Sequence, residues 1–146
     1  MTSSSQAHTG QTPAPSAEAE ALHRALFTLD SHIDIPWPAR GDAFEDTEAR
    51  RVDLPKMQKG GMSAGCFVAY IAQAKVDAEG HAQAQAQCLA MLDVINGMQG
   101  SQNGVTARVC STVAEIEAAY KAGVLAVIPA VENGYAMGDD PAVLAQ

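Results

Sequence analysis

Short, almost wholly apolar segments alternate with longer amphipathic segments along most of this chain. The segments MSAGCFVAY (62–70) and VLAVIPAVE (124–132) have the near-continuous apolar character of strands that are buried on both faces. TLDSHID (28–34) is a shorter and more polar predicted strand, which ends before Pro36 because proline cannot donate to a strand ladder. The pattern therefore predicts three strands, the last two of them deeply buried.

Helical patterns precede and separate these strands. Four helical segments are predicted. The first begins at Ala17, the second is a helical turn over 53–59, and the third and fourth cover 76–98 and 112–123. Gly100, Asn103 and Gly104 break the third of these helices. The fourth begins with Thr112 and Glu115 at the spacing of a capping box. Its inward-facing residues are predicted to be Val113, Ile116, Ala119 and Tyr120.

Strands that alternate with helices imply right-handed βαβ units and a parallel sheet, which is the α/β fold class. Asp139, Asp140 and Pro141 have the composition of a further helix start, and the chain ends at Gln146 soon after them. We therefore expect residues 17–146 to be the N-terminal part of a larger α/β protein. Residues 1–16 (His8 included) consist mostly of Ser, Thr, Gln and Pro and are expected to form a disordered arm.

The charge balance narrows the range of partners. The chain has 9 basic and 17 acidic residues and a formal net charge of −8. This argues against nucleic acid or an anionic membrane surface as a partner, because both attract clustered Lys and Arg. No apolar run approaches the ~20 residues that span a bilayer. Residues 1–16 lack the basic and apolar regions of a secretory signal, so we expect a cytoplasmic protein.

Cysteine and isolated histidine residues suggest little chemistry. Cys66, Cys88 and Cys110 are widely spaced and form no metal-binding pattern, so they are interpreted as buried, reduced side chains rather than nucleophiles. His23 and His81 fall on predicted helices, where a surface or half-buried role for His23 and a solvent-exposed position for His81 are favoured over metal ligation.

Three other side chains are candidate metal ligands. His32 and Asp34 lie two residues apart on the first predicted strand, so both point to the same face. Glu132 ends the third strand, at the same end of a parallel sheet. An imidazole and two carboxylates at one rim could hold a divalent ion. A hydrogen-bonded turn for His32 and Asp34, and an ion pair or helix cap for Glu132, remain the alternatives.

These residues resemble the membrane (renal) dipeptidases, zinc metallopeptidases of the amidohydrolase superfamily. The resemblance lies in LDSHIDIPW (29–37), VDLPKMQKGGMSAGCFVAY (52–70) and AVIPAVENG (126–134), and it covers roughly residues 20–146. Most amidohydrolases have His-x-His on the first strand, whereas His-x-Asp is the dipeptidase variant.

The resemblance implies the N-terminal part, about three βα units, of a TIM (β/α)₈ barrel that binds two zinc ions. His32 and Asp34 would ligate one ion and Glu132 would bridge both. A hydroxide between the ions would hydrolyse the peptide bond of a dipeptide. Tyr70 matches a tyrosine near the substrate and would help to hold its carboxylate, a buried strand-end tyrosine being the alternative. Trp37 would pack over the site mouth.

The sequence departs from the family pattern in two respects. Asn133-Gly134-Tyr135 stands where the family usually has a sequence close to Gly-Gly-His after the bridging glutamate. The family's remaining histidine ligands and its catalytic Arg, His and Asp lie on later strands. We therefore expect an incomplete chain that is inactive alone and lacks its C-terminal half, or that pairs as a homodimer. The alternatives are a non-enzymatic half-barrel interaction module and an amidohydrolase with another amide substrate.

Overall fold

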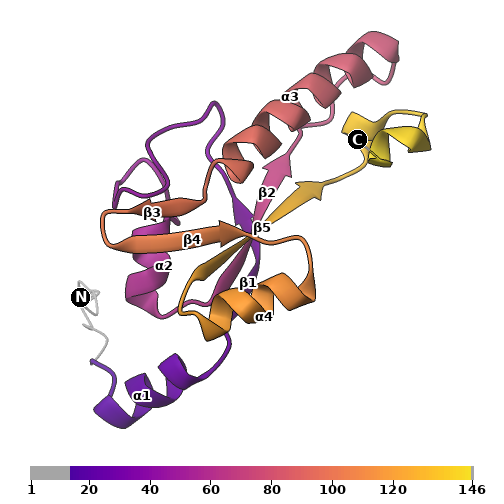
Figure 1. Cartoon of the computed structure of the whole chain (residues 1–146). Coiled ribbons are helices and arrows are strands. Elements are labelled where there is room, and N and C mark those ends of the chain that lie inside the picture. Colours follow the sequence, from indigo (N-terminus) through magenta and orange to yellow (C-terminus); the bar gives the residue numbers. More distant parts are fainter. Residues whose placement is uncertain (1–13, 146) are drawn as a thin grey trace, which may run out of the picture.

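The computed structural model of this chain describes residues 14–145, so most of the predicted 1–16 arm and His8 lie outside the described residues. The described part is a five-stranded sheet with helices on both faces, in the strand order β1-β2-β5-β4-β3 (Figure 1). The strands are β1 (Leu29–Asp34), β2 (Ala64–Tyr70), β3 (Gly100–Gln102), β4 (Val105–Val109) and β5 (Leu125–Glu132). The helices are α1 (Ala17–Ala25), α2 (Leu54–Gly60), α3 (Ala78–Asn96) and α4 (Val113–Lys121), and the 3-10 helices η1 (Tyr135–Met137) and η2 (Pro141–Ala145) follow β5.

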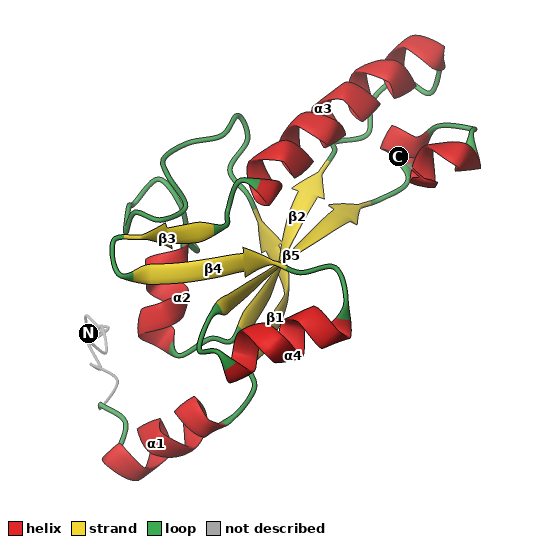
Figure 2. Cartoon of the chain, in the orientation of Figure 1, coloured by secondary structure: helices red, strands yellow, loops and turns green. Residues whose placement is uncertain are grey.

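The α/β class and the three predicted strands are confirmed, but the prediction that the sheet has only three strands is wrong. The segment interpreted as a break after α3 is an antiparallel hairpin of β3 and β4 (Figure 2). Asn103 and Gly104 form its two-residue turn, with φ of 51° and 77°. Asn-Gly is the preferred pair for such a turn, because both residues need positive φ. The hairpin adds β4 to the sheet, parallel to β5.

The two faces of the sheet are covered by different helices. On one face, Phe67 and Val127 pack with residues of α2 and α3 in the larger hydrophobic cluster. On the other face, Ala64 and Ala126 pack with Ala119 of α4 in a smaller cluster. Right-handed crossovers explain this division. The chain moves across the sheet in one direction from β1 to β2 and on to β4 by way of α2 and α3, and it moves back from β4 to β5 by way of α4, so α4 must lie on the opposite face.

The face of α4 was predicted only in part. Its capping box between Thr112 and Glu115 is present, and Ala119 is fully buried. Val113, predicted to face inward, is 71% exposed, and Tyr120 is 36% exposed. The physical reason is the small size of the cluster under α4: Ala119 is the fully buried residue of this helix, Ile116 packs partly buried beside it, and Val113, the first residue of the helix, lies outside the cluster.

The final predicted helix also differs. It is a 3-10 helix, η2, in which the Asp140 carboxylate accepts a hydrogen bond from the Ala142 amide at 2.9 Å. The acidic residue before Pro141 thus acts as the composition predicted, although the helix type is different.

Candidate metal centre

The candidate ligands lie at the carboxyl ends of the parallel strands. Asp34 is the last residue of β1 and pairs with Val68, while Glu132 is the last residue of β5 and pairs with Tyr70. Because Val68 and Tyr70 are two residues apart on β2, Asp34 and Glu132 project from the same face. Ile33, between the two β1 ligands, is 4% exposed and packs in the core on the opposite face.

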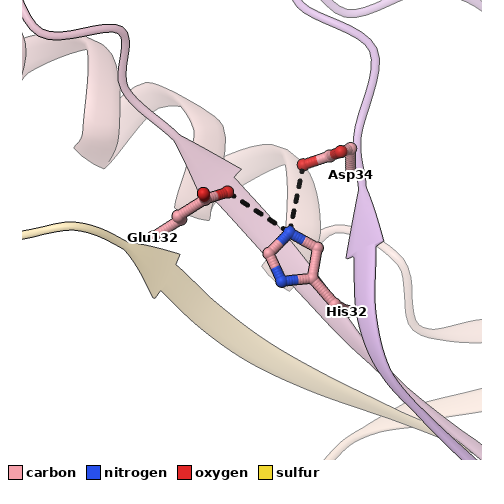
Figure 3. Close-up of side chains that lie close together, drawn as sticks. All are labelled: His32, Asp34 and Glu132. Carbon is pink, nitrogen blue, oxygen red and sulfur yellow. Dashed lines mark ion pairs between the residues drawn. The ribbon is translucent and has the colours of Figure 1, made fainter.

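The three side chains converge across β2, which separates β1 from β5 (Figure 3). Two strand spacings amount to about 9.5 Å, which the long side chains of His32 and Glu132 bridge. His32 Nε2 lies 3.2 Å from a Glu132 carboxylate oxygen and 3.5 Å from an Asp34 carboxylate oxygen. The side chains of His32, Asp34 and Glu132 are 50%, 70% and 41% exposed, so they meet on an open rim.

The donor set fits a divalent ion. One ligand atom from each of the three residues lies within 4.8 Å of the other two, and within residues 14–145 this is the one such group of three. Ligand atoms ~2.1 Å from a tetrahedral zinc ion lie about 3.4 Å apart, close to the two separations that His32 makes. One imidazole nitrogen and two carboxylates are also donors that zinc accepts.

Tyr70 lies beside this group. It ends β2, next to Glu132 in the parallel register, and it is 47% exposed. The alternative of a buried strand-end tyrosine is therefore wrong. Trp37, predicted to pack over the site mouth, follows β1 and is 40% exposed.

Asn133 and Tyr135, which stand where the family pattern differs, connect the loops that follow β5 and β2. The Asn133 side chain donates to the Ile71 carbonyl at 2.8 Å and accepts from the Tyr135 amide at 2.9 Å. The buried Tyr135 hydroxyl donates to the Lys75 carbonyl at 2.6 Å. These bonds hold the two loops together beside the rim that carries Glu132. The residues that depart from the family pattern, Asn133 and Tyr135, therefore have a structural role in this chain.

The loop from β2 ends in the N-terminal cap of α3. The Asp77 side chain accepts from the Gly80 amide at 2.9 Å and pairs with Lys75. The Lys75 hydrogen bond, followed by that from Gly80, lowers the pKa of Asp77. His81 packs edge-on against Tyr135 at 5.2 Å between ring centroids, so the expected exposed position is wrong: it is a partly buried packing residue.

The other residues considered from the sequence have structural surroundings. Cys88 and Cys110 are buried as predicted, while Cys66 is half-buried. Burial raises the pKa of all three thiols, and the nearby Asp30 charge adds a smaller upward effect at Cys66. His23 Nε2 lies 2.8 Å from the Gly60 carbonyl oxygen and links α1 to α2.

Sequence reasoning missed Asp30. Its carboxylate accepts a hydrogen bond from the His32 amide at 3.0 Å. The available signal was an aspartate two residues before the ligand, a spacing at which the side chain commonly bonds the backbone. The parallel central strands and the ligand cluster at their carboxyl ends together define an α/β protein with a candidate metal centre.

Comparison with known proteins identifies the family. The sequence pattern of the membrane dipeptidase family (peptidase family M19) matches residues 16–146. The chain therefore belongs to this family, as its resemblance predicted. No curated protein sequence gives a significant match.

Two solved structures are similar to this chain. The probable dipeptidase PvdM from Pseudomonas aeruginosa has a TM-score of 0.71 and 20% sequence identity, over 88% of this chain and 33% of that chain. Dipeptidase AC, a metallopeptidase of family M19, has a TM-score of 0.67 and 27% identity, over 82% of this chain and 39% of that chain. The chain thus spans 33–39% of the solved chains it matches, which is consistent with the predicted partial barrel. Among the described residues, no helix is long and apolar enough to cross a membrane.

Proposed function

We propose that this chain supplies the first metal ligands of a zinc-dependent dipeptidase. The observation that carries the proposal is the convergence of His32, Asp34 and Glu132 within 4.8 Å at the carboxyl ends of β1 and β5. That edge of a parallel α/β barrel is where active sites form. Membership of the membrane dipeptidase family supports a dipeptide as the substrate.

Each residue has a distinct role in this proposal. His32, through Nε2, and Asp34, through its carboxylate, would hold one ion, and the Glu132 carboxylate would be shared between that ion and a second one. When bound, zinc polarises the peptide carbonyl and lowers the pKa of water. The Tyr70 hydroxyl would donate to the terminal carboxylate of a dipeptide; the exposure of Tyr70 and its position next to Glu132 on the adjacent strand support this role.

The first test is zinc binding by this chain, measured by competition with a chromophoric chelator. Asp34→Ala and Glu132→Ala should each lower the zinc affinity by more than roughly tenfold. Glu117→Ala is the matched control, because Glu117 is an exposed carboxylate on α4 that pairs with Lys121 away from the rim. Unchanged affinity in both rim variants, or equal loss in the control, would contradict the metal assignment.

The second test concerns activity. The 146-residue chain with zinc should hydrolyse no dipeptide, because the proposal places the remaining catalytic groups on later barrel strands. Reading the coding DNA past codon 146, with the intact mass of the native protein, shows whether those strands follow. A product of barrel size that cleaves dipeptides, including those with a C-terminal D-residue, is the expected result. A barrel-sized product that binds zinc and cleaves no dipeptide would contradict the substrate class.

A half-barrel interaction module is the second candidate, favoured by one observation. Among the described residues, β5 pairs with β4 only over 125–127, whereas it pairs with β2 along 126–132. The edge of β5 from Ile128 to Glu132 is thus open to a further strand on the β4 side. A stable complex of this chain with a second copy, retained when Glu132 is replaced, would favour this function over catalysis.

A further inference from the structure

The strand that carries His32 and Asp34 is irregular just before them. Leu29 pairs with Ala64 and Asp34 pairs with Val68, so β1 advances by five residues over a stretch in which β2 advances by four. The register shift lies between Asp30 and Ile33. One extra residue on one strand is a β-bulge, here in a parallel pair.

This bulge decides which face carries the ligands. Residues five apart in a regular strand point to opposite faces, yet Leu29 and Asp34 share a face, because their partners Ala64 and Val68 do. Leu29 accordingly lines the same groove as Ile128 and residues of α4. If β1 continued from Leu29 without the bulge, the alternation would turn Ile33 toward that groove. His32 and Asp34 would then point into the apolar core beside α2 and α3.

A specific side chain accompanies the bulge. The Asp30 carboxylate accepts from the His32 amide at 3.0 Å, within the irregular segment. A bulge disrupts the ladder locally, and an aspartate that bonds the amide two residues later replaces a ladder bond with a local one. Asp30 is exposed and pairs with no cation within the described residues.

We propose that Asp30 is a positioning residue for the metal centre: by accepting the His32 amide hydrogen bond it holds the bulge that turns His32 and Asp34 toward Glu132. This inference rests on the proposed metal site. Asp30 itself is not a ligand in this proposal, because its carboxylate is engaged with the backbone. Its role therefore depends on the reach and geometry of the acceptor oxygen rather than on its charge.

Two substitutions separate geometry from charge. Asp30→Asn keeps an acceptor oxygen at the same position and removes the charge. Asp30→Glu keeps the charge and moves the oxygens one methylene further from the backbone. We expect Asp30→Glu to lower the zinc affinity about tenfold, as loss of an orienting partner does, and Asp30→Asn to bind zinc like the unchanged chain. Asp30→Ala should behave like Asp30→Glu.

Asp140→Ala is the matched control. Asp140 is also exposed and also accepts from the amide two residues later, that of Ala142, at 2.9 Å. Its loss removes the same type of bond away from the rim, so zinc affinity should not change. The urea midpoint of each variant is measured alongside, and the Asn and Glu variants remain comparable even if Asp30→Ala does not fold.

A metal-free measurement completes the experiment. Hydrogen exchange of the His32 amide, followed by NMR without zinc, should be on the order of tenfold faster in Asp30→Glu and unchanged in Asp30→Asn. If neither exchange nor zinc affinity changes in Asp30→Glu, or if Asp30→Asn loses affinity as Asp30→Glu does, the positioning role is overturned. If the unchanged chain binds no zinc, the proposed metal site fails, while the exchange comparison still decides whether Asp30 holds His32.

Discussion

The two faces of the sheet differ in what they contribute. The face toward α2 and α3 carries large, fully buried side chains such as Phe67 and Met91. The opposite face has a small alanine-rich cluster under α4 and, at the strand ends, three polar side chains that are 41–70% exposed. Stability and candidate chemistry are thus separated by the alternation of side chains along the same strands. Substitutions on one face should affect unfolding, and substitutions on the other should affect ligand binding.

The largest effect is expected in the core. Phe67 is fully buried between the sheet and the helices that cover it. Phe67→Ala removes that packing and leaves a cavity, so the free energy of unfolding should fall by about 3–5 kcal/mol. Urea denaturation measures this change. Val113→Ala, at a position that is 71% exposed, should change it by less than about 0.5 kcal/mol, and a similar cost at both positions would contradict the division between faces.

The second prediction concerns the rim. His32→Ala removes the nitrogen that lies 3.2 Å from Glu132 and 3.5 Å from Asp34. Zinc affinity should fall by roughly 100-fold. The free energy of unfolding without zinc should stay within about 0.5 kcal/mol of that of the unchanged chain, because the His32 side chain is not part of the hydrophobic core. Isothermal titration and urea denaturation of the same samples provide both values. A large loss of stability without zinc would show that the rim also supports the fold.

A third, intermediate effect is expected at the start of α2. Asp53 is fully buried; it accepts from the Lys56 amide at 2.9 Å as the helix cap and also pairs with the Lys56 ammonium group. Asp53→Ala should lower the free energy of unfolding by about 1–2 kcal/mol from the lost cap alone. Asp53→Asn keeps a capping oxygen and should lose less. Equal losses in urea denaturation would show that the charge matters more than the cap.

The smallest effect is a pH dependence on the α4 side. Hydrogen bonds from the Ser111 amide and then from Thr112 lower the pKa of Glu115. A carboxyl whose pKa is lower in the folded state stabilises the protein above its ordinary pKa of 4.5, and this contribution is lost as the pH falls through the lowered value. The difference in urea midpoint between the unchanged chain and Glu115→Gln should therefore shrink from pH 7 toward pH 3. A difference that is independent of pH would contradict this linkage.

Local patterns predicted much of the fold for identifiable reasons. The apolar runs over 62–70 and 124–132 are strands because their residues suit burial on both faces. The capping box at Thr112 was predictable because its bonds join residues three apart. The β3–β4 hairpin was missed because its strands are short and its Asn103-Gly104 turn was interpreted only as a helix break.

The candidate site was predictable to the extent that it follows from strand periodicity and strand ends. His32 and Asp34 share a face because they are two residues apart, and Glu132 joins them because parallel strands end at one edge. Tyr70 next to Glu132 follows from the β2–β5 register, which no local pattern specifies. The segment after Glu132 that departs from the family pattern could not be interpreted from the sequence. Asn133 and Tyr135 form hydrogen bonds with residues about 60 positions earlier in the chain, and no local pattern shows this.

The sequence by itself determined most of the element types, the family and the three candidate ligands, since these depend on residue identity and on spacing within short segments. Only the tertiary structure decided the strand order, the separate helices on the two faces and the bulge at Asp30 that selects the ligand face. These features arise from pairing between segments far apart in the chain. A shift of one residue in such a pairing reverses every side chain beyond it while leaving the local pattern unchanged.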